Sequence, residues 1–171
     1  MQKETIHTGQ APAAIGPYVQ AVRVGDLIYT AGQGGLIPET GEMVKGGVEA
    51  QAEQTMNNLS AVLAAAGSDF AHVIKTTIFL RYIKDFAAVN EVYARFFESV
   101  YPARSTVAVA ALPMSALVEI EMVALVPRAV NDPAEQPQER KVEMSKGKDK
   151  GKKEKKEKKA KKEKKDKKKK K

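Results

Sequence analysis

The sequence contains no cysteine and only two histidines, His7 and His72. Without cysteine, the chain can form neither a disulfide bond nor a thiolate metal site, and it has no cysteine nucleophile. The two histidines lie far apart in the sequence, and neither is near a second candidate ligand. We therefore expect no metal site and no Ser-His triad.

Long apolar runs are also missing. No run approaches the roughly 18 residues that a membrane-spanning helix needs. The first twenty residues include Glu4, His7 and Gln10 but no apolar stretch of the kind found in secretory signals. These absences predict a cytoplasmic protein.

The net charge of +8 is unevenly distributed along the 171 residues. Residues 1–127 carry 8 Lys and Arg against 12 Asp and Glu, a net charge of −4. Residues 128–171 carry 21 against 9, a net charge of +12. We expect one domain over residues 1–127, which is long enough to bury a core, followed by a linker at 128–140.

The C-terminal segment, residues 141–171, holds 19 lysines and too few apolar side chains for a core, which predicts a disordered tail. Two interpretations of the tail stay open. It is either a solubilising extension or an electrostatic tether to a polyanion such as RNA, DNA or an anionic surface. Because the tail has no aromatic residue to stack on bases, we expect no sequence specificity.

Hydrophobic periodicity predicts the element order β-β-α-β-α-β-β. The predicted strands are residues 18–24, 27–33, 73–83, 104–111 and 118–126. The first predicted helix starts at Val48 and ends at a Gly67 cap. The second begins at an Asp85 cap and ends before Pro102, with an apolar stripe of Phe86, Val89, Tyr93, Phe96 and Val100 and with Val92 and Phe97 at its margin.

Each predicted helix is apolar on one face only, so we expect an α+β fold in which one mixed sheet has both helices packed on one side. Alternation in the last strand assigns Val118, Ile120 and Met122 to the core. The opposite face holds Glu119, Glu121, Val123 and Leu125 and changes from acidic to aliphatic. A partly apolar sheet face without its own helices predicts burial against other subunits, that is, a homo-oligomer.

Five side chains could carry chemistry, and each also has an ordinary structural interpretation. Arg104 is either a solvated arginine at a strand end or a guanidinium that binds a carboxylate through two hydrogen bonds. Glu119 and Glu121 share one strand face, and they are either solvent-exposed strand residues or include one carboxylate that acts on a water molecule. Tyr18 is either an ordinary amphipathic aromatic at a strand start or a site residue. Asn90 is either a locally hydrogen-bonded amide, the more common case, or a site residue.

Several segments, in the same order, resemble the reactive intermediate deaminase A (RidA) family, also known as the YjgF/YER057c/UK114 family. They are 11–18, 31–33, 73–77, 85–90, 102–105 and 118–121, and the resemblance covers about residues 3–127. It implies a chorismate-mutase-like fold, a homotrimer and active sites between neighbouring subunits. It also implies hydrolysis of 2-imino and enamine acids, such as 2-aminoacrylate and 2-iminobutyrate, to 2-keto acids and ammonia. No cofactor is expected, because such substrates are already electrophiles.

By this resemblance, Arg104 binds the substrate carboxylate and Glu119 orients the attacking water. Tyr18, Gly32 and Asn90 correspond to pocket positions. Thr106 stands where many relatives have cysteine, and its hydroxyl can still donate a hydrogen bond. The alternative is a non-catalytic member of the same fold that binds small ligands or RNA, like a translation inhibitor, with a polyanion-tethering tail. The presence of Arg104 together with Glu119 favours the enzyme.

Overall fold

The computed structural model describes residues 2–98 and 100–127 of the chain. The predicted linker at 128–140 and the predicted lysine-rich tail at 141–171 lie outside these residues. Within the described ranges, no helix is both long and apolar enough to cross a membrane.

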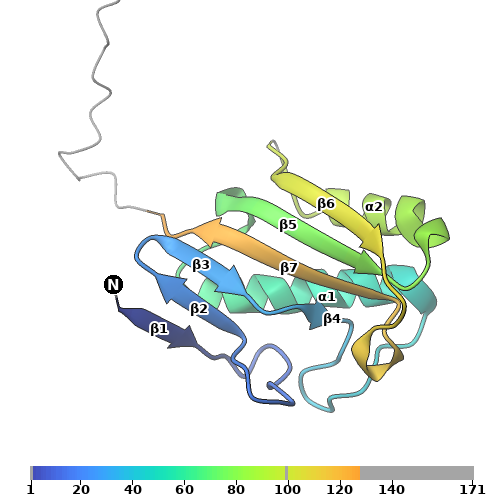
Figure 1. Ribbon diagram of the computed structural model, residues 1–171, viewed down its shortest axis with the longest axis horizontal. Coiled ribbons are helices and arrows are strands. Elements are labelled where there is room, and N and C mark those ends of the chain that lie inside the picture. The colour runs from blue at the N-terminus through green and yellow to red at the C-terminus, as the bar shows by residue number, and fades with distance from the viewer. Residues whose placement is uncertain (1, 99, 128–171) are drawn as a thin grey trace, which may run out of the picture. The chain divides into compact units, whose positions relative to one another are not determined.

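A mixed sheet forms the centre of the body, and both α-helices lie on one side of it (Figure 1). The strands are β1 (Lys3–Ile6), β2 (Ala21–Val24), β3 (Leu27–Thr30), β4 (Gln33–Gly34), β5 (Val73–Leu80), β6 (Ala103–Ala108) and β7 (Val118–Leu125). Their order is β1-β2-β3-β7-β5-β6, and β4 also pairs with β7. The pairing of β5 with β6 is parallel and the other described strand pairings are antiparallel. The predicted mixed sheet with two helices on one face is confirmed.

The first helix, α1 (Gly47–Ala65), buries the stripe that the sequence predicts, including Ala52, Met56, Leu59 and Leu63. The helix ends at Ala65, and Gly67, two residues later, has the positive φ of 77° expected of a glycine that follows a helix end. The backbone N–H groups of Gly67 and Ser68 donate to the carbonyls of Ala64 and Leu63, at 3.0 and 2.9 Å. Glycine adopts this left-handed conformation readily, and the two bonds satisfy carbonyls that the helix end leaves unpaired.

The second helix, α2 (Phe86–Ala94), is shorter than predicted. The helix begins directly after Asp85, as predicted, although the Asp85 side chain makes no capping hydrogen bond. The predicted continuation of the buried stripe to Val100 is wrong, because Val100 is 80% exposed. Phe97, expected at the margin of the stripe, is buried instead. Its ring centroid lies 4.7 Å from that of Tyr93 and 5.5 Å from that of Phe70, in the 3-10 helix η1 (Phe70–His72). These rings pack together where the sequence predicted that the helix would continue.

The N-terminal region also differs from the prediction, because β1 was not expected and the strand predicted at 18–24 begins only at Ala21. The Tyr18 N–H donates to the Gly16 carbonyl at 2.8 Å, so Tyr18 lies in a turn. The buried Gln20 amide donates to the carbonyls of Ala11 and Pro12, at 3.1 and 2.9 Å. These side-chain bonds hold the preceding loop and delay the start of the strand.

The two faces of β7 carry the side chains that alternation predicts. Val118, Ile120 and Met122 are buried beneath the helices, whereas Glu119, Glu121 and Val123 lie partly exposed on the opposite face, here called the open face. Tyr29 pairs with Val123 and adds an apolar side chain that is 44% exposed to this face. The open face is therefore partly apolar although the described residues place no helix over it.

Candidate active site

Glu119 lies near the start of β7 on the open face, where it is half-buried. Burial raises the pKa of its carboxyl, and the nearby negative charge of Glu121 raises this pKa further. β4 pairs Gly34 with Glu119, and Gly32, which immediately precedes β4, lies at the Glu119 carboxylate. A side chain at Gly32 would overlap the Glu119 carboxylate, so glycine is the residue that leaves room for it.

A cavity of about 340 Å³ opens beside this carboxylate and is here called the Glu119 cavity. Glu119, Gly32 and Tyr18 line it together with apolar side chains from three loops. The Tyr18 hydroxyl accepts a hydrogen bond from the Ile15 N–H at 3.4 Å, which links the ring to the loop that precedes it. The structure thus places three of the six predicted site residues in one cavity.

Arg104 lies in β6, at the edge of the described sheet, and its side chain is exposed. Its guanidinium carbon is 5.0 Å from the centroid of the Tyr93 ring and 5.7 Å from that of Phe86, both on α2. These distances allow cation–π attraction, which orients the guanidinium. Burial raises the pKa of Tyr93, and its hydroxyl lies 2.9 Å from Thr76 Oγ1.

A second cavity, of about 430 Å³, is lined by Arg104, Asn90, Tyr93, Tyr101 and Pro102 and is here called the Arg104 cavity. Asn90 is half-buried on α2. A guanidinium beside an amide offers several N–H donors, the arrangement that binds a carboxylate.

Thr106 follows Arg104 by two residues in β6, so both side chains lie on the same face of the strand. The Thr106 Oγ1 atom is buried and has no hydrogen-bond partner among the residues that the structure describes. A buried hydroxyl without a partner is costly, and such groups are uncommon in folded proteins. Thr106 lines neither the Glu119 cavity nor the Arg104 cavity.

Strand register places Arg104 and Glu119 on opposite faces of the sheet. Arg104 pairs with Thr76, which pairs with Met122 on the helix-covered face. Glu119 is three residues from Met122 along β7 and therefore points to the open face. Arg104 and Glu119 lie two strands apart across the sheet and three residues apart along the strand direction, so their Cα atoms are about 14 Å apart. One small substrate cannot contact both side chains of the same chain.

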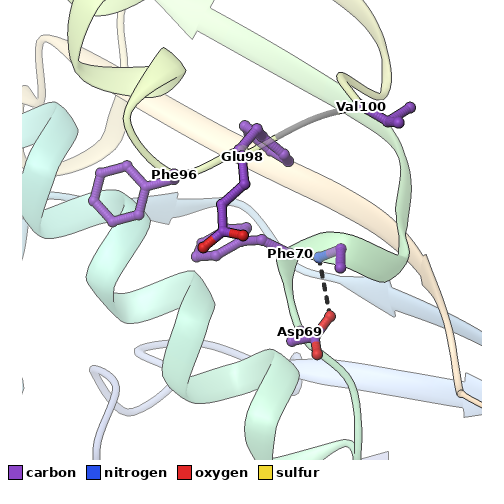
Figure 2. Close-up of a pocket in the computed structure, with 7 residues that line it drawn as sticks. Asp69, Phe70, Phe96, Glu98 and Val100 are labelled. Atoms are coloured by element: carbon purple, nitrogen blue, oxygen red, sulfur yellow. Dashed lines mark hydrogen bonds between the residues drawn. The ribbon is translucent and has the colours of Figure 1, made fainter.

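Figure 2 shows a third cavity, of about 460 Å³, between η1 and the segment after α2. Its rim carries the carboxylates of Asp69 and Glu98, and its walls include three phenylalanine rings. Asp69 accepts a hydrogen bond from the Ala71 N–H at 2.9 Å, and its contact with His72 lowers the Asp69 pKa. No predicted site residue lines this cavity, and its carboxylates disfavour an anionic substrate.

Within residues 2–98 and 100–127, no three His, Asp or Glu side chains are grouped as they would be around a metal ion. Several residues that were not predicted as site residues line the other two cavities, and Tyr93 and Met114 are two of them. Tyr93 supports Arg104, and Met114 lines the Glu119 cavity. Periodicity assigned Tyr93 to the core, and no glycine marks the loop around Met114 as a special turn.

Comparison with known proteins adds a family and named relatives. The profile of the family described as Endoribonuclease L-PSP matches residues 8–126. Protein DfrA of Myxococcus xanthus is 55% identical over 127 residues, covering 73% of this chain and 97% of that protein. The human 2-iminobutanoate/2-iminopropanoate deaminase is 49% identical over 123 residues, covering 72% and 90%. The crystal structure of the YjgF gene product of E. coli matches with a TM-score of 0.69 and 46% identity, covering 72% and 99%.

Proposed function

The chain belongs to the Endoribonuclease L-PSP family, to which the RidA and YjgF proteins belong, and from this premise we propose that it hydrolyses reactive 2-imino and enamine acids to 2-keto acids and ammonia. The observation that carries the proposal is the half-buried Glu119 with a raised pKa beside Gly32. A carboxylate with a raised pKa is a better base for a bound water than an exposed one.

The proposed reaction adds water across a carbon–nitrogen double bond. Glu119 holds the water and takes one of its protons as the oxygen attacks the imine carbon. The resulting tetrahedral carbinolamine carries a hydroxyl and an amino group on the same carbon. Proton transfer to the nitrogen then lets ammonia leave as the carbonyl forms. The product is the 2-keto acid, and the reaction needs no electron acceptor.

The Arg104 cavity is proposed to hold the other end of the substrate. The guanidinium binds the carboxylate, and the Asn90 amide lies in the same cavity. Thr106, two residues from Arg104 on the same face of β6, is proposed as a further pocket residue, although its buried hydroxyl lines neither cavity of the single chain. Tyr18 and Gly32 would shape the space around the imine. Fixing the carboxylate fixes the position of the reacting carbon.

Because Arg104 and Glu119 of one chain point away from each other, we propose that each active site combines the Arg104 cavity of one subunit with the Glu119 cavity of a neighbour. A cyclic trimer with a chorismate-mutase-like fold would form three such sites. The exposed edge strand β6 and the partly apolar open face are the surfaces that such an assembly would bury.

Shared sites predict that two inactive variants restore activity when mixed. Co-expressed Arg104→Ala and Glu119→Gln chains should give trimers in which about a quarter of the clefts combine an intact Arg104 with an intact Glu119. Mixed trimers, isolated through two different affinity tags, have one intact cleft in three and should recover about a third of the wild-type rate with 2-iminobutyrate. Each variant alone should stay inactive, and the molar mass should be measured by sedimentation.

Activity no higher than that of the single variants would mean that each site lies within one chain, contrary to the proposal. A sedimentation result of monomers would have the same meaning.

The raised pKa of Glu119 leads to a prediction about pH. Only the deprotonated carboxyl can accept a proton from water, so kcat/KM should fall as pH drops through the Glu119 pKa. Glu121→Gln removes a neighbouring negative charge and lowers this pKa, so the acid limb of the profile should move to lower pH. Glu53→Gln, on the exposed side of α1, is the matched control and should not move it. An acid limb unmoved by Glu121→Gln, or moved to higher pH, would contradict the assignment of the base.

The alternative of an RNA-binding or translation-inhibitor-like protein finds less support in the body. Residues 1–127 carry 8 cationic against 12 acidic side chains, a balance that disfavours contact with phosphates. The proposed polyanion contact concerns residues 141–171 only, and it is compatible with catalysis by the body.

A further inference from the structure

The Glu119 cavity has walls that are almost entirely apolar. Ile15, Leu36, Met43, Pro113 and Met114 line it in addition to the residues named above. They come from three loops that are far apart in the sequence. Its volume of about 340 Å³ lies within the range of small-ligand pockets, and it extends beyond the carboxylate that would hold the water.

One wall is a small hairpin whose backbone is well held. Leu36 and Met43 face each other in a β-bridge. The Ile37 N–H donates to the Glu42 carbonyl at 2.9 Å, and the Val44 N–H donates to the Gly35 carbonyl at 2.9 Å. These bonds make the apolar wall part of the fold.

The opposite wall contains backbone that only a strongly held loop can adopt. Met114 and the following Ser115 both have positive φ, 54° and 56°, and neither is glycine. Such conformations are unfavourable for residues with a side chain, and they concentrate at functional sites. The loop is tied on its C-terminal side, where the Leu117 N–H donates to the buried Gln51 Oε1 at 2.7 Å. The loop thus keeps Met114 at the cavity although this conformation is unfavourable.

The charges around the cavity exclude one class of side chain. Among the described residues that line it, Glu119 carries the only formal charge and no lysine or arginine is present. A second carboxylate placed there would be repelled and left without a cationic partner. An aliphatic chain would instead bury apolar surface against Met114 and the hairpin.

We infer that the Glu119 cavity binds the side chain of the substrate and that Met114 selects 2-imino acids with extended aliphatic side chains over those with acidic ones. This inference rests on the proposed function and adds the substrate class. The flexible thioether of Met114 suits linear chains of differing length.

The test uses imines made in situ by a broad-specificity amino-acid oxidase from alanine, 2-aminobutyrate, norvaline, norleucine and glutamate, with catalase present. Wild-type kcat/KM should rise by about fourfold for each methylene buried, and the imine of glutamate should be at least about 100-fold poorer than that of norvaline. Met114→Ala should reduce the gain to about twofold for each methylene. Met114→Lys should raise kcat/KM for the glutamate imine by about tenfold or more and lower it for norvaline.

The matched control is Ile83→Ala, which removes a residue that is 60% exposed and lines neither cavity; it should leave the chain-length profile unchanged. Melting temperatures of all variants check folding. Affinities of the wild type for the corresponding 2-keto acids, measured by calorimetry, should follow the same chain-length order and do not depend on turnover.

The outcomes separate the two proposals. Failure of the wild type to accelerate hydrolysis of any imine, with keto acids bound in the expected order, would overturn the proposed function and leave the side-chain selection standing. Hydrolysis with a flat chain-length profile, or a glutamate imine as good as norvaline's, would overturn the role of the cavity. If both Met114 variants ranked the imine substrates by kcat/KM as the wild type does, with the same gain for each methylene, the role of Met114 would be overturned.

Discussion

Replacing Arg104 with alanine is expected to lower kcat/KM for 2-iminobutyrate by about 100- to 1,000-fold. Two charge-assisted hydrogen bonds to the substrate carboxylate together contribute roughly 3–4 kcal/mol, and each 1.4 kcal/mol is about tenfold in rate. Tyr93 and Phe86 of α2 remain in the variant, so the change removes the cation and leaves its aromatic support. The measurement is ammonia release from imine generated by a dehydratase, with the spontaneous rate subtracted.

Two further variants test whether the shape of the guanidinium matters as well as its charge. Arg104→Lys keeps the positive charge but not the planar pair of donors, and should lose about tenfold. Arg81→Ala is the matched control, because Arg81 is also an arginine packed on an aromatic ring, 4.9 Å from the Tyr82 centroid, and it lines neither cavity. Wild-type rates in Arg104→Ala would rule out the carboxylate clamp.

Glu119→Gln is expected to lower kcat/KM by about 100-fold or more while raising the melting temperature at pH 7. Glutamine keeps the size of the side chain but cannot take a proton from water. The stability effect has a separate cause. Burial and Glu121 raise the pKa of Glu119 in the folded protein, so its charged form is less favourable there than in the unfolded chain.

The size of this stability effect depends on pH. Below pH 4.5, the ordinary pKa of glutamate, Glu119 is protonated in both the folded and the unfolded protein, and the stability that its neutral form contributes is fully present. That contribution is lost as pH rises through the raised folded-state pKa. The wild type and Glu119→Gln should therefore melt at similar temperatures in acid and diverge toward pH 7. A lower melting temperature for the variant at pH 7 would attribute its lost activity to damage of the fold.

Local sequence patterns predicted those parts of the fold that depend on neighbouring residues. Alternation in β7 assigned Ile120 to the core and Glu119 to the other face, and Gly67 marked the end of α1, as the structure confirms. The predicted length of α2 was wrong because the apolar stripe continues to Val100 in the sequence, whereas α2 ends at Ala94 and Phe97 packs on Phe70 of η1. Such a contact between distant segments leaves no periodic signal.

The candidate site was predictable to a similar degree. The resemblance to known relatives selected Arg104 and Glu119, although neither residue is distinctive by itself. The walls of the Glu119 cavity were not predicted, because three separate loops form them and because the left-handed backbone at Met114 and Ser115 occurs without glycine. The loop is anchored on Gln51 and by backbone hydrogen bonds from Ala116 to Pro113 and from Arg81 to Leu117, contacts that sequence periodicity does not reveal.

The sequence by itself determined that the body is acidic, and its resemblance to known relatives singled out Arg104 and Glu119 as the groups proposed to act on a small carboxylic acid. Tertiary structure alone decided where these two groups point. The face on which a side chain lies depends on strand register, and the pairing of Arg104 with Thr76, and of Thr76 with Met122, is set by packing between distant segments. Because that register puts the two groups on opposite faces of one chain, the proposed chemistry requires a second copy.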